Sequence, residues 1–98
     1  SDTYERPKFV ASIDRGLHPT QKSLPLMEWL VKIHSHQWNT ILDPFMGSGT
    51  TGVACMNLDR NFIGIEKEKK YYDIANDRVQ FKYSAKLQDC HVNPAVYQ

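Results

Sequence analysis

The pattern of apolar and polar residues predicts a helix near the start of the chain. Apolar side chains recur at helical spacing: Leu26, Met27, Leu30, Val31 and Ile33. Ser23 is a suitable N-cap for this helix, and Pro25 falls in the first turn, where the missing N–H of proline is tolerated. We therefore expect a helix over about 24–34.

Two short apolar runs, at about 40–44 and 61–66, have the length of strands. Neighbouring residues such as Ile41 and Leu42 are both apolar rather than alternating, which is typical of a parallel strand buried on both faces. Helical periodicity follows each run, over about 50–60 and 67–81. Gly52 lies in the first turn of the first of these helices, where it costs stability relative to alanine, so we expect a packing or ligand reason for it.

This order of elements predicts an α/β fold in which the two strands are parallel and joined by a right-handed crossover. A parallel sheet normally has several strands, and an open strand edge invites pairing with another chain. We expect part of a Rossmann-like domain, completed by oligomerisation or by an N-terminal part. The predicted organisation is an irregular lead-in at 1–17, the partial domain at 18–83 and an irregular tail at 84–98.

Composition narrows the class of protein only modestly. The chain has 98 residues, of which 41% are hydrophobic and 23% charged, as in an ordinary globular domain. Its net charge of +1 gives no strong basic signature for nucleic acid. No apolar run approaches the roughly 18 residues of a membrane span. Two widely separated cysteines favour free thiols in a reducing compartment, so we expect a cytoplasmic protein without membrane contact.

No metal site is expected. The residues that could suggest one are His34, His36, His91 and Cys90, and their spacing matches no zinc pattern.

The glycine-rich segment 47–52, directly after the first predicted strand, carries the chemistry. Gly47, Gly49 and Gly52 satisfy the G-x-G-x-x-G pattern, and the N-terminus of the following helix suits an anionic group. Glu66 ends the second strand, where an acidic residue reaches the ribose hydroxyls in nucleoside-binding folds. These features favour an adenosine-type ligand. The alternative is a tight strand-to-helix turn beside a surface glutamate.

Asp43 separates two cofactor classes. No G-K-[ST] follows the glycines, so a P-loop is excluded. A nicotinamide dinucleotide fits the glycine pattern, but its pyrophosphate would meet the carboxylate of Asp43. S-adenosylmethionine carries both an ammonium and a carboxylate, which suit Asp43 and the helix N-terminus respectively.

Three motifs in order resemble one enzyme family: "HPTQK" at 18–22, "LDPFMGSGTTGVA" at 42–54 and "FIGIE" at 62–66. Together they resemble the C-terminal part of the permuted amino-directed DNA methyltransferases, which methylate adenine N6 or cytosine N4. The resemblance extends from about His18 to Val79 and is far more specific than a lone glycine pattern. One departure is Ser23, since the family usually has proline directly after "HPTQK".

The resemblance implies S-adenosylmethionine as cofactor and a role for each matching residue. Asp43 would hold the amino group, and Glu66 the ribose hydroxyls, with Lys67 beside the adenine. The backbone of 45–49 would wrap the methionine part. The residues implied around that part are Phe45, Gly47, Ser48, Gly49, Thr50 and Thr51, with Thr20, Gln21 and Lys22 toward its carboxylate. His18 opens "HPTQK", and a structural turn role is as plausible for it as ligand contact.

An absence limits what the chain is expected to do. The family's catalytic signature is Asp/Asn/Ser-Pro-Pro-aromatic, which binds the flipped target base. The signature is missing here, because the sequence contains no Pro-Pro. The resemblance thus implies an enzyme by family, acting on DNA through the complete enzyme, with this chain alone inactive and no catalytic residue in it. We expect a homo-oligomer or a complementing N-terminal polypeptide. The alternatives are a self-associating remnant without activity and, more remotely, a nicotinamide oxidoreductase fragment.

Overall fold

The computed structural model describes residues 22–86 and 92–98. Along the chain the elements are α1 (Leu24–His34), β1 (Thr40–Asp43), α2 (Thr50–Asn57), β2 (Asn61–Ile65), α3 (Lys69–Ala85) and β3 (Pro94–Tyr97). The helix predicted over 24–34 is confirmed, and Leu26 N–H donates to the Ser23 hydroxyl at 3.5 Å as an N-cap. The predicted strands and the two later helices are also present. The lead-in at 1–17 lies outside the described residues.

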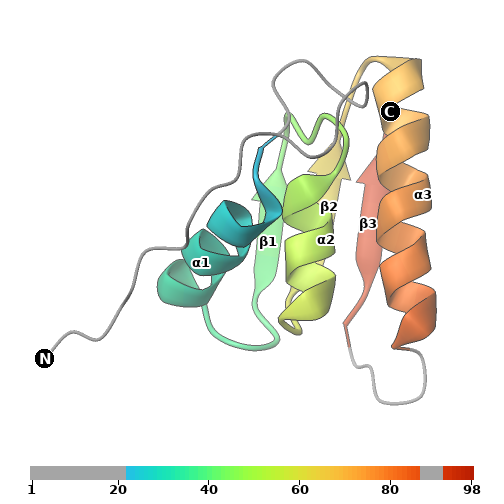
Figure 1. Cartoon of the computed structure of the whole chain (residues 1–98). Coiled ribbons are helices and arrows are strands. Elements are labelled where there is room, and N and C mark those ends of the chain that lie inside the picture. The colour runs from blue at the N-terminus through green and yellow to red at the C-terminus, as the bar shows by residue number, and fades with distance from the viewer. Residues whose placement is uncertain (1–21, 87–91) are drawn as a thin grey trace, which may run out of the picture.

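The three strands form one parallel sheet in the order β1–β2–β3 (Figure 1). The expectations of two strands and of an irregular segment from residue 84 are therefore corrected. Helix α3 continues to Ala85, and β3 pairs with the outer edge of β2. The segment 94–97 has no periodicity of its own. Its strand conformation depends on the unpaired backbone of β2, which a sequence pattern does not display.

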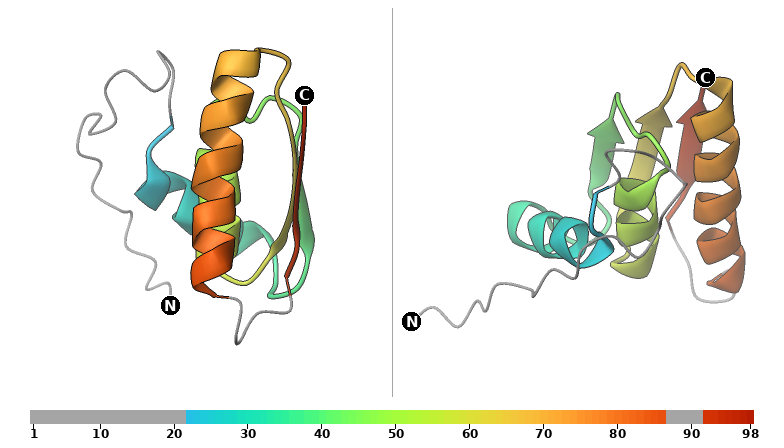
Figure 2. Two further views of the ribbon diagram at one scale, coloured as in Figure 1. Left: turned by 90° about the vertical axis from the view of Figure 1, so that its right-hand side faces the viewer. Right: turned by 45° about the horizontal axis from the view of Figure 1, so that its top comes forward.

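The three helices form one layer on a single face of the sheet (Figure 2). Phe62 and Gly64 point into the helix layer and are buried, whereas Leu42 and Tyr97 are 59% and 57% exposed. The expectation of strands buried on both faces is thus wrong for the residues that the structure describes. Neighbouring apolar residues in a strand did not indicate burial of both faces of the sheet. Among the described residues, only the strand positions that face the helices are covered.

The core lies between the helix layer and the sheet, around Phe62 and Met56, both fully buried. Gly52 lies against this core. A Cβ atom on Gly52 would stand 2.6 Å from Phe62 Cε2 and 2.6 Å from Val79 Cγ2, which is too close for real atoms. Close packing of α2 on β2 and α3 therefore requires glycine at this position, and the packing reason, not a ligand, accounts for it.

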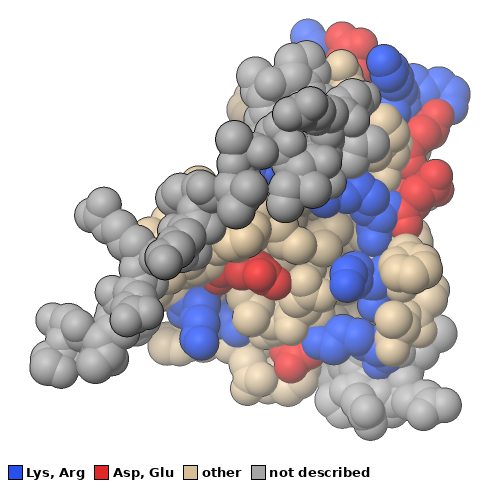
Figure 3. Space-filling model, viewed as in Figure 1, with Lys and Arg blue, Asp and Glu red and all other residues tan. Residues whose placement is uncertain are grey.

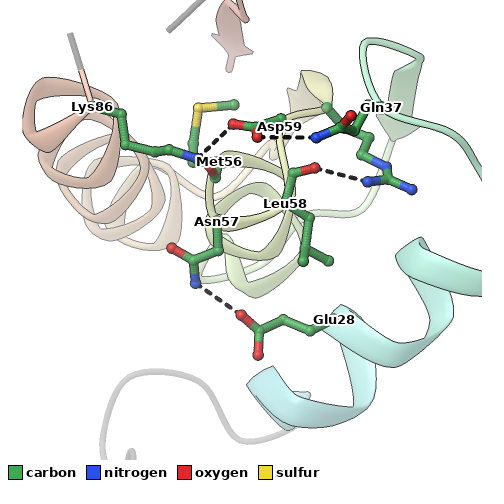
Figure 4. Close-up of polar contacts among 8 residues, drawn as sticks. Glu28, Gln37, Met56, Asn57, Leu58, Asp59 and Lys86 are labelled. Atoms are coloured by element: carbon green, nitrogen blue, oxygen red, sulfur yellow. Dashed lines mark hydrogen bonds and ion pairs between the residues drawn. The ribbon is translucent and has the colours of Figure 1, made fainter. Parts of the chain in front are cut away.

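Side chains from the other helices converge on the C-terminal end of α2 (Figure 4). Lys86 Nζ donates to the Met56 carbonyl at 2.7 Å and pairs with Asp59 Oδ1 at 2.6 Å. From the other side, Asn57 Nδ2 donates to Glu28 Oε2 of α1 at 2.9 Å. These contacts fix the direction of α2, and its N-terminus consequently points to the carboxyl ends of the strands.

Candidate functional site

The candidate site lies where β1 and β2 end, and it consists of the loop 43–49, the start of α2 and Glu66. The loop is tied to β2 by two hydrogen bonds: Met46 N–H donates to the Ile65 carbonyl at 3.0 Å, and Gly47 N–H donates to Glu66 Oε1 at 3.0 Å. Ligands of parallel α/β folds bind at this edge of the sheet. The fold thus brings together the aspartate, the glycines and the glutamate that the sequence analysis singled out.

Asp43 is the last residue of β1, and only one of its two carboxylate oxygens accepts a hydrogen bond. Its Oδ1 accepts from Phe45 N–H at 3.1 Å, which orients the carboxylate. Its Oδ2 is buried and accepts no hydrogen bond; Lys22 Nζ forms an ion pair with it at 3.9 Å, which is beyond hydrogen-bonding distance. Only 12% of the Asp43 side chain is exposed. A buried, unsatisfied carboxylate oxygen is costly, and a cationic donor such as an ammonium group would relieve that cost.

The glycine turn needs glycine at its second position. Gly49 has a φ of 86° and a backbone in the left-handed region, and it is the N-cap of α2. A Cβ atom there would stand 2.8 Å from the Cβ of Ala75, so helix α3 rests directly on the turn. No side-chain hydrogen bond caps the N-terminus of α2. Its first-turn amides are oriented toward the site, as in sites for phosphate or carboxylate groups.

Two backbone amides orient the carboxylate of Glu66. Gly47 N–H donates to its Oε1 at 3.0 Å and Glu68 N–H donates to its Oε2 at 2.9 Å. Each carboxylate oxygen has a second lone pair for a further donor, such as a ribose hydroxyl. These contacts orient the carboxylate at the end of β2 while leaving acceptor capacity for a diol.

The remaining predicted residues differ in exposure. Phe45 is 82% exposed, and Lys67 is also exposed, whereas Ser48, Thr50 and Thr51 are buried. Arg78 Nη1 donates to the Ser48 hydroxyl at 3.1 Å and to Thr50 Oγ1 at 3.3 Å. Half of the Lys22 side chain is exposed. His18, Thr20 and Gln21 lie outside the described residues.

The sequence analysis missed Arg78 and included Met46 only as part of the backbone segment 45–49. Met46 supplies backbone contacts on both sides of the turn, donating to Ile65 O and accepting from Gly49 N–H at 2.9 Å. Arg78 reaches the turn from α3. A basic residue at helical spacing from Ala75 is a weak signal, and only the fold shows that this helix face touches the loop.

Charge on the helix-covered face is mixed. In Figure 3 the described Lys and Arg residues lie among Asp and Glu rather than forming one continuous basic area. Within the described residues no three His, Cys, Asp or Glu side chains cluster as a metal site would require. Cys90 and His91 are outside that part of the chain. None of the described helices is long and apolar enough to cross a membrane.

The βαβ unit, the glycine turn and the two oriented carboxylates define a Rossmann-like segment of the type that binds a nucleoside-containing ligand. The family model of the N6/N4 methyltransferases, described as DNA methylase, matches residues 1–77. The chain therefore belongs to the DNA methylase family, and the resemblance seen in the sequence is confirmed.

Individual relatives agree with this assignment. The Type II methyltransferase M2.DpnII of Streptococcus pneumoniae is 49% identical over 65 residues, covering 66% of this chain and 24% of that protein. M.HindIII of Haemophilus influenzae is 44% identical over 70 residues, covering 71% and 23%. The crystal structure of the M1.HpyAVI–SAM complex matches with a TM-score of 0.69 and 55% identity, covering 80% of this chain and 39% of that one. The chain thus spans about a quarter of the length of these curated relatives.

Proposed function

We propose that this chain is the S-adenosylmethionine-binding segment of a DNA methyltransferase that modifies adenine N6 or cytosine N4. The observation that carries the proposal is Asp43, whose buried Oδ2 lacks a donor directly beside the glycine turn. The methionine part of S-adenosylmethionine brings an ammonium group, which is the donor that this oxygen lacks. A cytoplasmic location is part of the proposal, because the DNA substrate lies there.

Three features of the chain would each receive one part of the cofactor. Asp43 would accept from the ammonium, the first turn of α2 would face the carboxylate, and Glu66 would accept from the ribose hydroxyls. When bound, the cofactor supplies the methyl group and its sulfonium leaving group. The remaining proposed contacts are His18, Thr20, Gln21, Lys22, Phe45, Gly47, Ser48, Gly49, Thr50, Thr51 and Lys67.

The same carboxylate argues against a nicotinamide dinucleotide. A pyrophosphate at the glycine turn would lie near the carboxylate of Asp43, whose Oδ2 is buried and offers no donor to a phosphate group. Membership of the DNA methylase family supports the same choice. The oxidoreductase alternative has no comparable support.

Binding at this site is tested by isothermal titration of S-adenosylmethionine into the chain and into Asp43→Asn. The amide keeps the shape of the side chain but removes the charge that attracts the ammonium. We expect the affinity to fall about 10- to 100-fold, as for a charged hydrogen bond worth about 1.5–3 kcal/mol. Asp73→Asn is the matched control, since Asp73 is exposed and its carboxylate pairs with Lys69 within α3. An Asp43→Asn affinity equal to that of Asp73→Asn would contradict the assignment.

We further propose that another segment or polypeptide supplies the groups that act on the target base. The sequence has no Pro-Pro, and the segment matched to M2.DpnII covers only 24% of that protein. DNA would then be a partner of the complete enzyme.

This second proposal predicts no methyl transfer to DNA by the isolated chain under conditions in which it binds the cofactor. Transfer of a radiolabelled methyl group to unmethylated DNA is the measurement, with a full-length relative such as M.HindIII as the positive control. Turnover by the isolated chain would overturn the proposal.

A self-associating remnant without cofactor function is the second candidate, favoured by the exposed apolar face of the sheet.

A further inference from the structure

The glycine turn is supported from behind by two residues of α3. Ala75 is fully buried against Gly49, and Arg78, one helical turn further along, reaches the residues on either side of it. Arg78 Nη1 donates to the Ser48 carbonyl at 2.8 Å, to Ser48 Oγ at 3.1 Å and to Thr50 Oγ1 at 3.3 Å. One guanidinium nitrogen therefore connects α3 to both the turn and the first residue of α2.

The contact with the Ser48 carbonyl fixes one particular peptide plane. In the trans peptide between Ser48 and Gly49, the C=O and the N–H point in opposite directions. The C=O accepts from Arg78 at 2.8 Å, and the N–H donates to the Met46 carbonyl at 2.9 Å. The plane is thus held at both ends, in an orientation that requires the left-handed backbone of Gly49.

The acceptors of Arg78 are well shielded from water. Ser48 and Thr50 are each only 3% exposed, so their hydrogen bonds to a charged donor are stronger than surface contacts. The guanidinium remains protonated across the whole working pH range, and the charge that holds the turn is therefore permanent. The carboxylates of Asp43 and Glu66 and the first-turn amides of α2 all lie outside α3. Helix α3 therefore supplies none of the groups proposed to face the ligand.

We propose that Arg78 is a positioning residue, which sets the affinity for S-adenosylmethionine by holding the Ser48–Gly49 peptide in its binding orientation. It acts through the loop and does not touch the cofactor. The inference rests on the proposed function for its effect on affinity, whereas its effect on the loop can be measured without a ligand.

The test compares Arg78→Met with Arg60→Met and Arg78→Lys. Methionine keeps much of the arginine volume without any donor, and Arg60 is a buried arginine that does not contact the turn. For Arg78→Met we expect at least about tenfold weaker S-adenosylmethionine binding by the folded protein, with a smaller loss for Arg78→Lys. Arg60→Met should lower the unfolding temperature while the folded protein keeps near wild-type affinity.

Amide hydrogen exchange across 46–51 in the ligand-free chain provides the second readout. Arg78→Met should exchange faster in this segment, and Arg60→Met should not. Wild-type affinity in Arg78→Met, or unchanged exchange of its loop, would overturn the inference. If the wild-type chain does not bind S-adenosylmethionine, the proposed function fails, and loop exchange alone decides the role of Arg78. If Arg78→Met does not fold, Arg78→Lys takes its place in both measurements.

Discussion

At the scale of single residues, burial decides what each polar or reactive group can do. Asp43 is mostly buried and one of its oxygens accepts no hydrogen bond, which is the basis of its proposed role in binding the cofactor's ammonium group. Cys55 is fully buried in α2, and desolvation raises the pKa of its thiol from 9.0 to about 12, against a smaller lowering by Arg60. The thiol is therefore a neutral part of the core rather than a nucleophile.

This pKa shift predicts a loss of stability at high pH. Below pH 9 the thiol is protonated in both the folded and the unfolded chain. Between pH 9 and about 12 only the unfolded chain loses the proton, so unfolding becomes more favourable as the pH rises. Denaturant unfolding between pH 8 and 11 should show a steeper decline for the wild type than for Cys55→Ala. If the free energy of unfolding declined equally with pH in the two proteins, the conclusion that the Cys55 thiol is buried and neutral would be contradicted.

At the scale of elements, α2 is oriented by cations at its C-terminus and leaves its N-terminus for the site. Arg60, 6% exposed, donates from Nη1 to the Leu58 carbonyl at 2.7 Å and from Nη2 to the Ser35 carbonyl at 2.8 Å. Leu58 and Ser35 are the C-caps of α2 and α1. One guanidinium thus satisfies carbonyls at two helix ends, where a positive charge also complements the helix dipoles.

Replacing this arginine should destabilise the whole fold. For Arg60→Met we expect a loss of about 2–4 kcal/mol in the free energy of unfolding, because partly buried carbonyls at two helix ends lose a charged donor that is itself buried. Urea titration followed by circular dichroism measures it. Lys32→Met, at an exposed position in the last turn of α1, is the control and should cost less than about 0.5 kcal/mol. Equal losses in the two variants would contradict the bridging role.

At the scale of the molecule, the described residues leave one face of the sheet uncovered. Leu42, Ile65 and Tyr97 are 59%, 38% and 57% exposed. Leu42 and Ile63 are register partners on neighbouring strands, as are Ile65 and Tyr97. Apolar side chains on adjacent strands form a continuous surface of the kind that marks an interaction site. The outer edge of β1 is also unpaired among the described residues.

This surface predicts self-association of the isolated chain, as the sequence analysis expected from an incomplete sheet. Sedimentation velocity over a range of concentrations should show species larger than a monomer. Leu42→Lys, which places a charge on the exposed face without touching the helix layer, should shift the distribution toward monomer. A wild-type chain that stays monomeric at high concentration would count against both self-association and the remnant hypothesis.

The elements with strong local patterns were predictable from the sequence. Helical periodicity gave α1, and motifs of fixed spacing gave the strand–turn–helix unit with Asp43, Gly49 and Glu66 at one edge of the sheet. The strand at 94–97 was missed, since its conformation depends on pairing with β2. The extent of burial was overestimated for the same kind of reason, because only packing shows which face of a strand is covered.

The sequence by itself determined the family, the cofactor class to be tested and the candidate residues, because these follow from residue type and spacing along the chain. Only the tertiary structure decided which side chains support the turn. Ala75 and Arg78 are distant from Gly49 in sequence, and they contact the turn because α3 packs on the same face of the sheet as α2. The unsatisfied oxygen of Asp43 was likewise visible only in three dimensions, since burial and hydrogen bonding are properties of the fold.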